Sequence, residues 1–196
     1  MPPSISKRHF IAAGASLAAL SVLTAGCTTT SGASGDPAAQ RLAIDTAADS
    51  ALSRLYREAP GSQQLVASSK GILVFPTFVS AGFIVGGASG QGVLRQAGKS
   101  IGYFRMTEGS VGLLAGAQSQ AVFILFMTDE TLKNFRASSG WTAGVDGSVA
   151  LINVGATGQV TTQTAQQPII GYVLTNSGLM ASLSLNGSRI TPLNLN

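Results

Sequence analysis

The chain has 196 residues, enough for one domain with a hydrophobic core. It is 45% hydrophobic but only 10% charged, whereas about 25% charged residues is typical of soluble domains. A single cysteine, Cys27, excludes an intramolecular disulfide, and the single histidine, His9, lies in a predicted leader, so the rest of the chain lacks the commonest general base. The formal net charge of +4 includes Lys7 and Arg8 of that leader, and no Lys/Arg cluster has the form of a nucleic-acid footprint, so nucleic acid is excluded as a partner.

The first segment has the pattern of a secretory signal peptide. A positive region at residues 6–11 runs into the apolar stretch Phe10–Leu23, which is shorter than the roughly 20 apolar residues of a membrane span. It ends in Leu23-Thr24-Ala25-Gly26-Cys27, which resembles a bacterial lipobox with Thr24 where leucine is usual. The resemblance implies a signal peptide at 1–26 and a covalent diacylglycerol and acyl chain (palmitate) on Cys27, with no other cofactor. The alternative is an ordinary secretory leader with an incidental cysteine.

Acylation of Cys27 bears directly on localisation. At about 0.8 kcal/mol per buried CH₂, two or three acyl chains hold a protein at a bilayer essentially permanently. Thr28 is not the aspartate that resembles an inner-membrane retention signal, so we expect a lipid-anchored protein of the bacterial outer membrane. Residues 6–11 also resemble a relaxed twin-arginine signal, which leaves that export route and the general secretory route open. The polar residues of 27–35 predict a flexible tether.

A helix is predicted to follow the tether. Asp36-Pro37 is a start signal, with Asp as N-cap and Pro in the first turn, and Pro60-Gly61 ends the helix. The segment 36–70 has four basic and four acidic residues and no Trp or Phe, which favours a helix covering the β domain over a membrane-surface helix. A second short helical turn is expected at Gln63–Ser69. The predicted apolar stripe of the first helix consists of Ala38, Leu42, Ala48, Leu52, Leu55, Tyr56 and Ala59.

Residues 71–127 are predicted to form short strands with many glycines. The run Ile72–Phe75 should end at Pro76, because proline cannot donate to a strand ladder, and a second strand is expected at Phe83–Val85. The surrounding glycines would let the sheet bend or let a neighbour pack against bare backbone. Further strands are predicted at 92–95, 101–106, 111–118 and 121–127, the last of them central and doubly buried, with a turn at 97–100.

The remaining residues predict one short helix and more hairpins. A helix near 129–137 begins after Thr128, and its acidic residues Asp129 and Glu130 fit a helix cap better than a catalytic carboxylate pair. Residues 141–154 are predicted as a strand pair turning at Asp146-Gly147, and 169–174 with 179–185 as a last hairpin. The expected fold is therefore α+β: a barrel-like sheet of eight or nine mostly antiparallel strands with the first helix packed on it.

The β-rich region contains glycine-rich and apolar blocks in a fixed order. They are Lys70–Pro76, Ala81–Gly87, Gly109–Gly112 with Gly116–Gln118, Val122–Thr128, Gly144–Ala150 and Gly178–Gly187. In order and spacing, over roughly Ala38–Leu195, the chain resembles the SYLF domain family, which includes bacterial lipoproteins and eukaryotic actin-patch proteins. The chain departs from the family pattern at Ser80 (often Lys), at Leu114 (commonly Gln) and in a tail without tyrosines.

The resemblance implies a non-catalytic SYLF-like domain at 36–196 that binds phospholipid through basic residues and an amphipathic N-terminal segment. It also implies homology to the actin-binding domain of yeast actin-patch proteins, although actin would have no place in a bacterial envelope. The expected function is thus an envelope lipoprotein that contacts a phospholipid membrane, and not an enzyme. The alternative is a structural or surface-antigen lipoprotein that docks an envelope protein. Lipid contacts are predicted at Lys70, Arg95, Lys99 and Arg105, near strand ends and turns, each worth about 1 kcal/mol at an anionic surface. The alternative, which is favoured for any one of these residues taken alone, is an ordinary solvated charge.

Overall fold

The computed structural model describes residues 36–82, 85–111, 116–152, 166–175, 178–179 and 185–195. The predicted signal peptide, Cys27 and the tether lie outside these residues. No helix among the described residues combines the length and hydropathy that crossing a bilayer requires. The helices are α1 (Pro37–Glu58), α2 (Ser62–Ser68) and α3 (Asp129–Ala137). The strands are β1 (Gly71–Gly82), β2 (Val85–Gln96), β3 (Lys99–Val111), β4 (Gly116–Phe126), β5 (Trp141–Thr142), β6 (Ala150–Leu151), β7 (Ile169–Thr175), β8 (Gly178–Leu179) and β9 (Arg189–Pro192).

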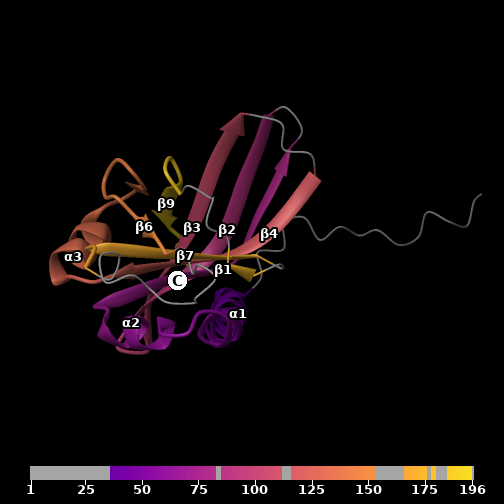
Figure 1. Cartoon of the computed structure of the whole chain (residues 1–196). Helices are drawn as coiled ribbons and strands as arrows, with labels where there is room; N and C mark the ends of the chain where they lie inside the picture. The colour runs from indigo at the N-terminus through magenta and orange to yellow at the C-terminus, as the bar shows by residue number, and fades with distance from the viewer. Residues whose placement is uncertain are drawn as a thin grey trace, which may run out of the picture. The chain divides into compact units, whose positions relative to one another are not determined.

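The strands form one mixed sheet in the order β5-β9-β3-β2-β1-β4-β7-β6, with β8 on β7 (Figure 1). Every pair is antiparallel except β6 with β7. The outer strands β5 and β6 are joined by residues 143–149, which span at most about 28 Å, whereas eight flat strands would be about 34 Å wide. The sheet must therefore curl. Consistent with this, a Cβ on Gly147 would lie within 3 Å of side chains from both sides of the sheet, 2.8 Å from Trp141 of β5 and 2.9 Å from Ile169 of β7. The predicted barrel-like α+β fold is confirmed as a curled half-barrel.

Pro76 does not end the first strand, contrary to the prediction. β1 continues to Gly82, and its pairing shifts register between Val74 and Thr77 against β2 and between Phe75 and Phe78 against β4. Because Pro76 has no paired residue on either side, its missing N–H costs no ladder bond at this bulge. A Cβ on the facing Gly92 would lie 2.4 Å from the Val74 carbonyl oxygen. The prediction that glycine lets a neighbour approach bare backbone is confirmed at this position.

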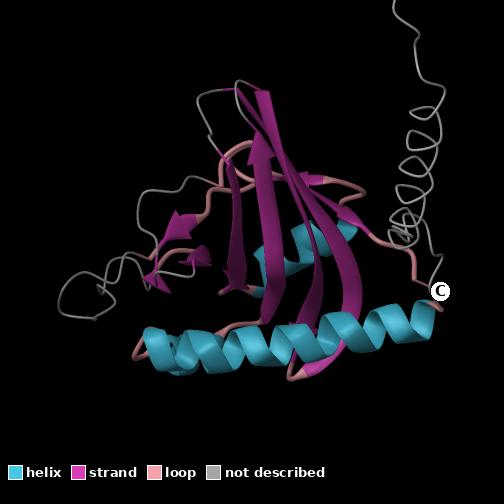
Figure 2. Ribbon diagram, turned by 90° about the vertical axis from the view of Figure 1, so that its right-hand side faces the viewer, coloured by secondary structure: helices cyan, strands magenta, loops and turns pink. Residues whose placement is uncertain are grey.

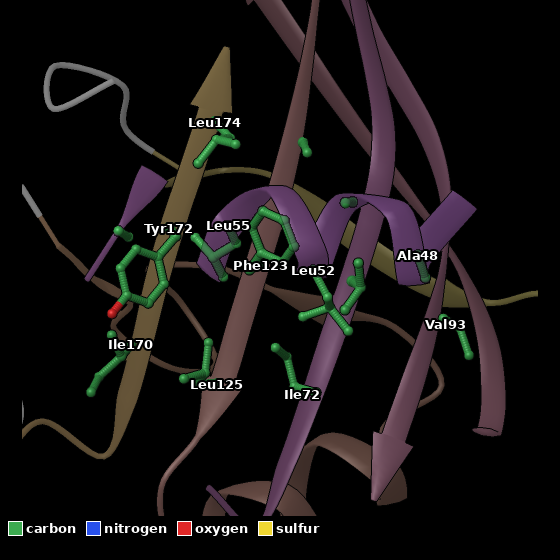
Figure 3. Packing of buried hydrophobic residues seen from close by; sticks show 14 of the residues in the cluster. Ala48, Leu52, Leu55, Ile72, Val93, Phe123, Leu125, Ile170, Tyr172 and Leu174 are labelled. Atoms are coloured by element: carbon green, nitrogen blue, oxygen red, sulfur yellow. The ribbon is translucent and has the colours of Figure 1, made fainter. Parts of the chain in front are cut away.

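Two apolar layers cover the two faces of the sheet. On one face Leu52 and Leu55 of α1 pack on Ile72, Phe123 and Tyr172 (Figure 3). The other face, inside the curl, holds α3 and Trp141 against Leu73, Phe75, Ile124 and Phe126. The Phe135 ring of α3 lies 4.8 Å from that of Phe126 and 5.8 Å from that of Trp141, centroid to centroid. The β4 segment Ala121–Phe126 is buried throughout, as its sequence predicted for a central strand.

The predicted cap of α1 is confirmed: the Asp36 carboxylate accepts a hydrogen bond of 3.1 Å from the Ala38 N–H, and Pro37 is the first helical residue. α1 lies across the strands at one end of the sheet (Figure 2). The predicted stripe is wrong at its start, since Leu42 is 68% exposed and Ala38 is exposed, whereas Ile44 and Ala51 are buried. At about 100° per residue, Leu42 lies about 160° around the helix from Ile44, so the two cannot face the sheet together.

The C-terminal part differs most from the sequence prediction. Trp141–Thr142 pairs with β9 and Ala150–Leu151 pairs with β7, so the segment 141–154 turns but its strands do not pair with each other. Strand β9, which pairs with β3, was not predicted. The predicted last hairpin is confirmed where β7 pairs with β8, and its residues 180–184 lie outside the described residues. Phe83-Ile84 of the predicted second strand and residues 112–115 of the predicted strand 111–118 also lie outside them. The β2–β3 turn at Ala97-Gly98 and the Thr128 cap of α3 are as predicted.

Candidate functional site

Three of the four residues predicted to contact lipid meet at one end of the sheet. Lys70 directly precedes β1, and Ile72 of β1 pairs with Arg95 near the end of β2. Lys99 is the first residue of β3. It pairs with Gln96, the residue after Arg95, across the tight turn at Ala97-Gly98. Arg105 lies six residues further along β3, about 20 Å from Lys99, and pairs with Thr191 of β9. The structure therefore groups Lys70, Arg95 and Lys99 and separates Arg105 from them.

The Arg95 guanidinium is engaged with α1. Its Nη1 forms an ion pair with Asp49 Oδ1, and its Nη2 lies 3.7 Å from Asp45 Oδ1 and donates a 3.1 Å hydrogen bond to the Asp45 carbonyl. The Arg95 side chain is 13% exposed, and its Nε is buried without a hydrogen-bond partner among the described residues. Arg95 thus fastens the first helix to the β2–β3 hairpin, while its charge is balanced by two carboxylates.

Asp45 is the centre of this contact. Its carboxylate accepts hydrogen bonds of 2.7 Å from Ser100 Oγ and 2.8 Å from Tyr103 Oη. Burial, together with the hydrogen bond to the Asp45 carboxylate, raises the pKa of Tyr103. We call the group Asp45, Asp49, Arg95, Ser100 and Tyr103 the α1–hairpin junction. It fixes the position of the hairpin tip that carries Lys99.

A hollow of about 500 Å³ lies beside the junction, among α1, α2, the start of β1 and the β2–β3 turn. Leu52, Val66 and Ile72 give it apolar walls, and Tyr56 and Arg95 give it polar groups. Burial raises the pKa of the Tyr56 hydroxyl, and the Arg95 charge opposes that rise. The volume falls in the range of small-molecule sites, which combine apolar walls with a few convergent polar groups.

Lys70 and Lys99 are sequence neighbours of Gly71 and Gly98, which line this hollow. The Lys70 side chain is 47% exposed, and its ammonium lies 3.6 Å from the Asp129 carboxylate, which is itself 82% exposed. Such surface pairs contribute about 0–1 kcal/mol, so Lys70 remains available to a ligand. Lys99 is exposed. The two lysines are accessible cations at this end of the fold, where the exposed Lys133 and Arg136 of α3 also line a hollow with Gln96 and Asp129.

The structure adds residues that the sequence did not indicate. Three of these residues lie on α1, and folding brings them next to β2 and β3: Asp45, Asp49 and Tyr56. In the sequence, only the alternating charges of the predicted helix pointed to the two aspartates. Asp129 lies in the first turn of α3 after the Thr128 cap, as predicted. In the described part of the chain no three His, Cys, Asp or Glu side chains are grouped in a way that could hold a metal ion.

Residues 107–194 match the family model of Ysc84, described as Las17-binding protein actin regulator. Among curated proteins, none matches the chain. The match begins within β3 and includes β4, α3 and all later strands up to β9. The five residues of the α1–hairpin junction all precede the matched region, and the junction joins α1 to β2 and to the first part of β3.

Proposed function

Because residues 107–194 belong to the SYLF (Ysc84) domain family, we propose that the chain is a non-catalytic lipoprotein of a bacterial envelope, anchored through Cys27, whose domain binds a phospholipid surface. The family is a lipid- or actin-related binding family and not a known enzyme family. That membership is the observation that carries the proposal. Cys27, outside the described residues, is the proposed site of acylation.

The two accessible lysines support a contact with anionic headgroups. Lys70 and Lys99 lie at the same end of the fold. Lys70 directly precedes β1 and Lys99 begins β3, and β2 lies between these two strands in the sheet. A basic residue near an anionic membrane surface contributes about 1 kcal/mol, so the pair contributes about 2 kcal/mol, roughly a 30-fold gain in affinity. This is small beside the acyl anchor, so the lysines would select the headgroup and the anchor would retain the protein.

The other two predicted lipid contacts, Arg95 and Arg105, contribute less directly to headgroup binding in this proposal. Arg95 contributes by holding the hairpin tip in position, since its guanidinium already pairs with Asp45 and Asp49. Arg105 is exposed but distant from the lysine pair, so its contribution to the same headgroup contact is smaller. The hollow beside the junction adds apolar walls within reach of a lipid that the lysines attract.

The alternative is a lipoprotein that docks an envelope protein. The description of the matched family names a protein, Las17, as the ligand of that family, and the 80% exposed Val145, which follows β5, offers an apolar contact. Chemical cross-linking of intact cells followed by purification would distinguish the two. One stoichiometric envelope protein cross-linked to the chain, together with no affinity for vesicles, would favour this alternative.

The anchor is tested by mass spectrometry of the chain purified from its native host membrane. We expect an N-terminal peptide that begins at Cys27 and carries the mass of a diacylglycerol and an acyl chain. An unmodified Cys27 would contradict the proposed lipoprotein. A Cys27→Ser variant that accumulates as an uncleaved precursor without the acyl mass is the matched control.

A further inference from the structure

Three oxygen-bearing side chains of α1 line the hollow beside the α1–hairpin junction: Asp49, Ser53 and Tyr56. Their spacing of four and three residues places them on one side of the helix. The Ser53 and Tyr56 hydroxyls have no hydrogen-bond partner among the described residues. Asp49 uses Oδ1 in its ion pair with Arg95, and no described residue bonds to its Oδ2. We call these three residues the α1 polar stripe, because each has an oxygen that is left for a ligand.

Apolar side chains form the wall next to the α1 polar stripe. Leu52 lies within one helical turn of all three polar residues and packs with Ile72 of β1 in the apolar layer on this face of the sheet (Figure 3). Val66 of α2 adds to this wall. The β2–β3 turn borders the hollow as well, and a Cβ on its Gly98 would meet no atom within 4 Å, so the hollow is open there. One small ligand can therefore contact a polar and an apolar side at once.

The charges of the hollow disfavour a phosphate or carboxylate ligand. The charged residues that line it are Asp49 and Arg95, which neutralise each other. The Arg95 guanidinium also lies 3.7 Å from the Asp45 carboxylate, so its positive charge is shared between two acidic groups. An anion in the hollow would lose its hydration beside Asp49 without gaining an unpaired cation among the lining residues. An uncharged ligand with hydroxyl groups avoids this cost.

We propose that the hollow binds an uncharged, polyhydroxylated ring compound of the size of a monosaccharide. The hydroxyl groups at the edge of such a ring donate to Asp49 Oδ2 and exchange hydrogen bonds with Ser53 and Tyr56. The C–H face of the ring packs on Leu52 and Ile72. The volume of about 500 Å³ lies within the range of small-molecule sites. This site goes beyond the proposed phospholipid contact, since it uses neither the accessible lysines nor a bilayer.

The test is an NMR titration of residues 27–196 carrying Cys27→Ser, a chain that contains every described residue and has no acyl chains. The probe is methyl β-D-glucopyranoside, and glucose 6-phosphate is the anionic comparison. Ala67 of α2 and Gly98 of the β2–β3 turn line the hollow from different elements, so their amide signals report its occupancy. We expect both signals to shift with a saturable dependence on the uncharged probe, and the phosphate to bind more weakly.

Two conservative substitutions in the α1 polar stripe test the proposed contacts. Ser53→Ala and Tyr56→Phe each remove one hydroxyl, so each should weaken binding of methyl β-D-glucopyranoside by roughly 2- to 10-fold. Ser50→Ala is the matched control, because the Ser50 hydroxyl donates to the Thr46 carbonyl and does not line the hollow. The control should leave the affinity unchanged.

The absence of saturable shifts at Ala67 and Gly98 would overturn the proposed site. An affinity that neither Ser53→Ala nor Tyr56→Phe lowers would overturn it too. Tighter binding of glucose 6-phosphate than of the uncharged glucoside would overturn it in favour of an anion site. None of these samples contains vesicles, so a failure of phospholipid binding would appear in a different experiment and would contradict the proposed function alone.

Discussion

Arg95 of β2 and Asp49 of α1, 46 positions apart in sequence, form an ion pair that fastens the first helix to the hairpin tip bearing Lys99. Asp45 completes the contact through Arg95, Ser100 and Tyr103. The pair links the helix that follows the tether to the strands that precede the family-matched region. The contact therefore fixes the position of Lys99 relative to α1.

Arg95→Gln should destabilise the domain by about 1–2 kcal/mol. The change leaves Asp45 and Asp49 without their cation, and the loss is moderated because Asp49 is 67% exposed. Urea unfolding of both proteins measures the difference. Arg57→Gln removes an exposed cation of the same helix and should change the free energy of unfolding by less than about 0.5 kcal/mol. Equal effects of the two substitutions would contradict the role of the junction.

Leu55→Ala and Leu42→Ala compare the two sides of α1. Leu55 is fully buried against the sheet, so its truncation should cost about 2–5 kcal/mol. Leu42 is exposed, and its truncation should cost less than about 0.5 kcal/mol in the free domain. Thermal unfolding measures both changes. A large cost at Leu42 would mean that the helix packs on the sheet in a different rotation.

Gly92→Ala should disrupt the bulge around Pro76. The added methyl would lie 2.4 Å from the Val74 carbonyl oxygen and 2.5 Å from Phe75 Cδ1, distances that force backbone movement. We expect a loss of about 1–3 kcal/mol in the free energy of unfolding. Gly109→Ala is the control, because a Cβ at this β3 position meets no atom within 4 Å. A neutral Gly92→Ala would contradict the close approach of β1 and β2.

Tyr172 gives the domain a sensitivity to high pH. Burial raises its pKa from 10.0 to about 12, so the folded state favours the neutral phenol. The associated stability is fully present below pH 10 and decreases as the pH rises from 10 towards 12. Melting temperatures measured across this window should fall less steeply for Tyr172→Phe than for the unsubstituted chain.

The same substitution should not destabilise the domain at pH 7. The Tyr172 hydroxyl is buried with no hydrogen-bond partner among the described residues, so its removal relieves an uncompensated desolvation cost. A loss of more than about 1 kcal/mol at pH 7 would reveal a hydrogen bond to this hydroxyl.

Local signals predicted the features that depend on neighbouring residues. Asp36-Pro37 and Thr128 begin their helices, and Ala97-Gly98 turns the β2–β3 hairpin, because each depends on a few adjacent residues. Pairings between distant segments were not predicted. The partner of β9 is β3, and Trp141 and Ala150 pair at opposite edges of a curled sheet, which no periodicity encodes.

The candidate site was predictable to a similar degree. The positions of Lys70, Arg95 and Lys99 near strand ends and turns followed from the sequence. The ion pairs of Arg95 did not, since its partners lie on α1. The exposure of Leu42 was missed because the apolar spacing of α1 admits two stripes, and only contact with the sheet selects between them.

Flotation with vesicles of residues 27–196 carrying Cys27→Ser, and therefore without signal peptide or acyl chains, measures whether the domain itself binds a phospholipid surface. We expect flotation with vesicles rich in anionic lipid, little flotation with neutral vesicles, and about a 30-fold weaker affinity when Lys70 and Lys99 are both changed to Gln. Arg105→Gln should have a smaller effect than either lysine change. Recovery of all the protein in the dense fraction with both kinds of vesicle would contradict phospholipid binding by the domain.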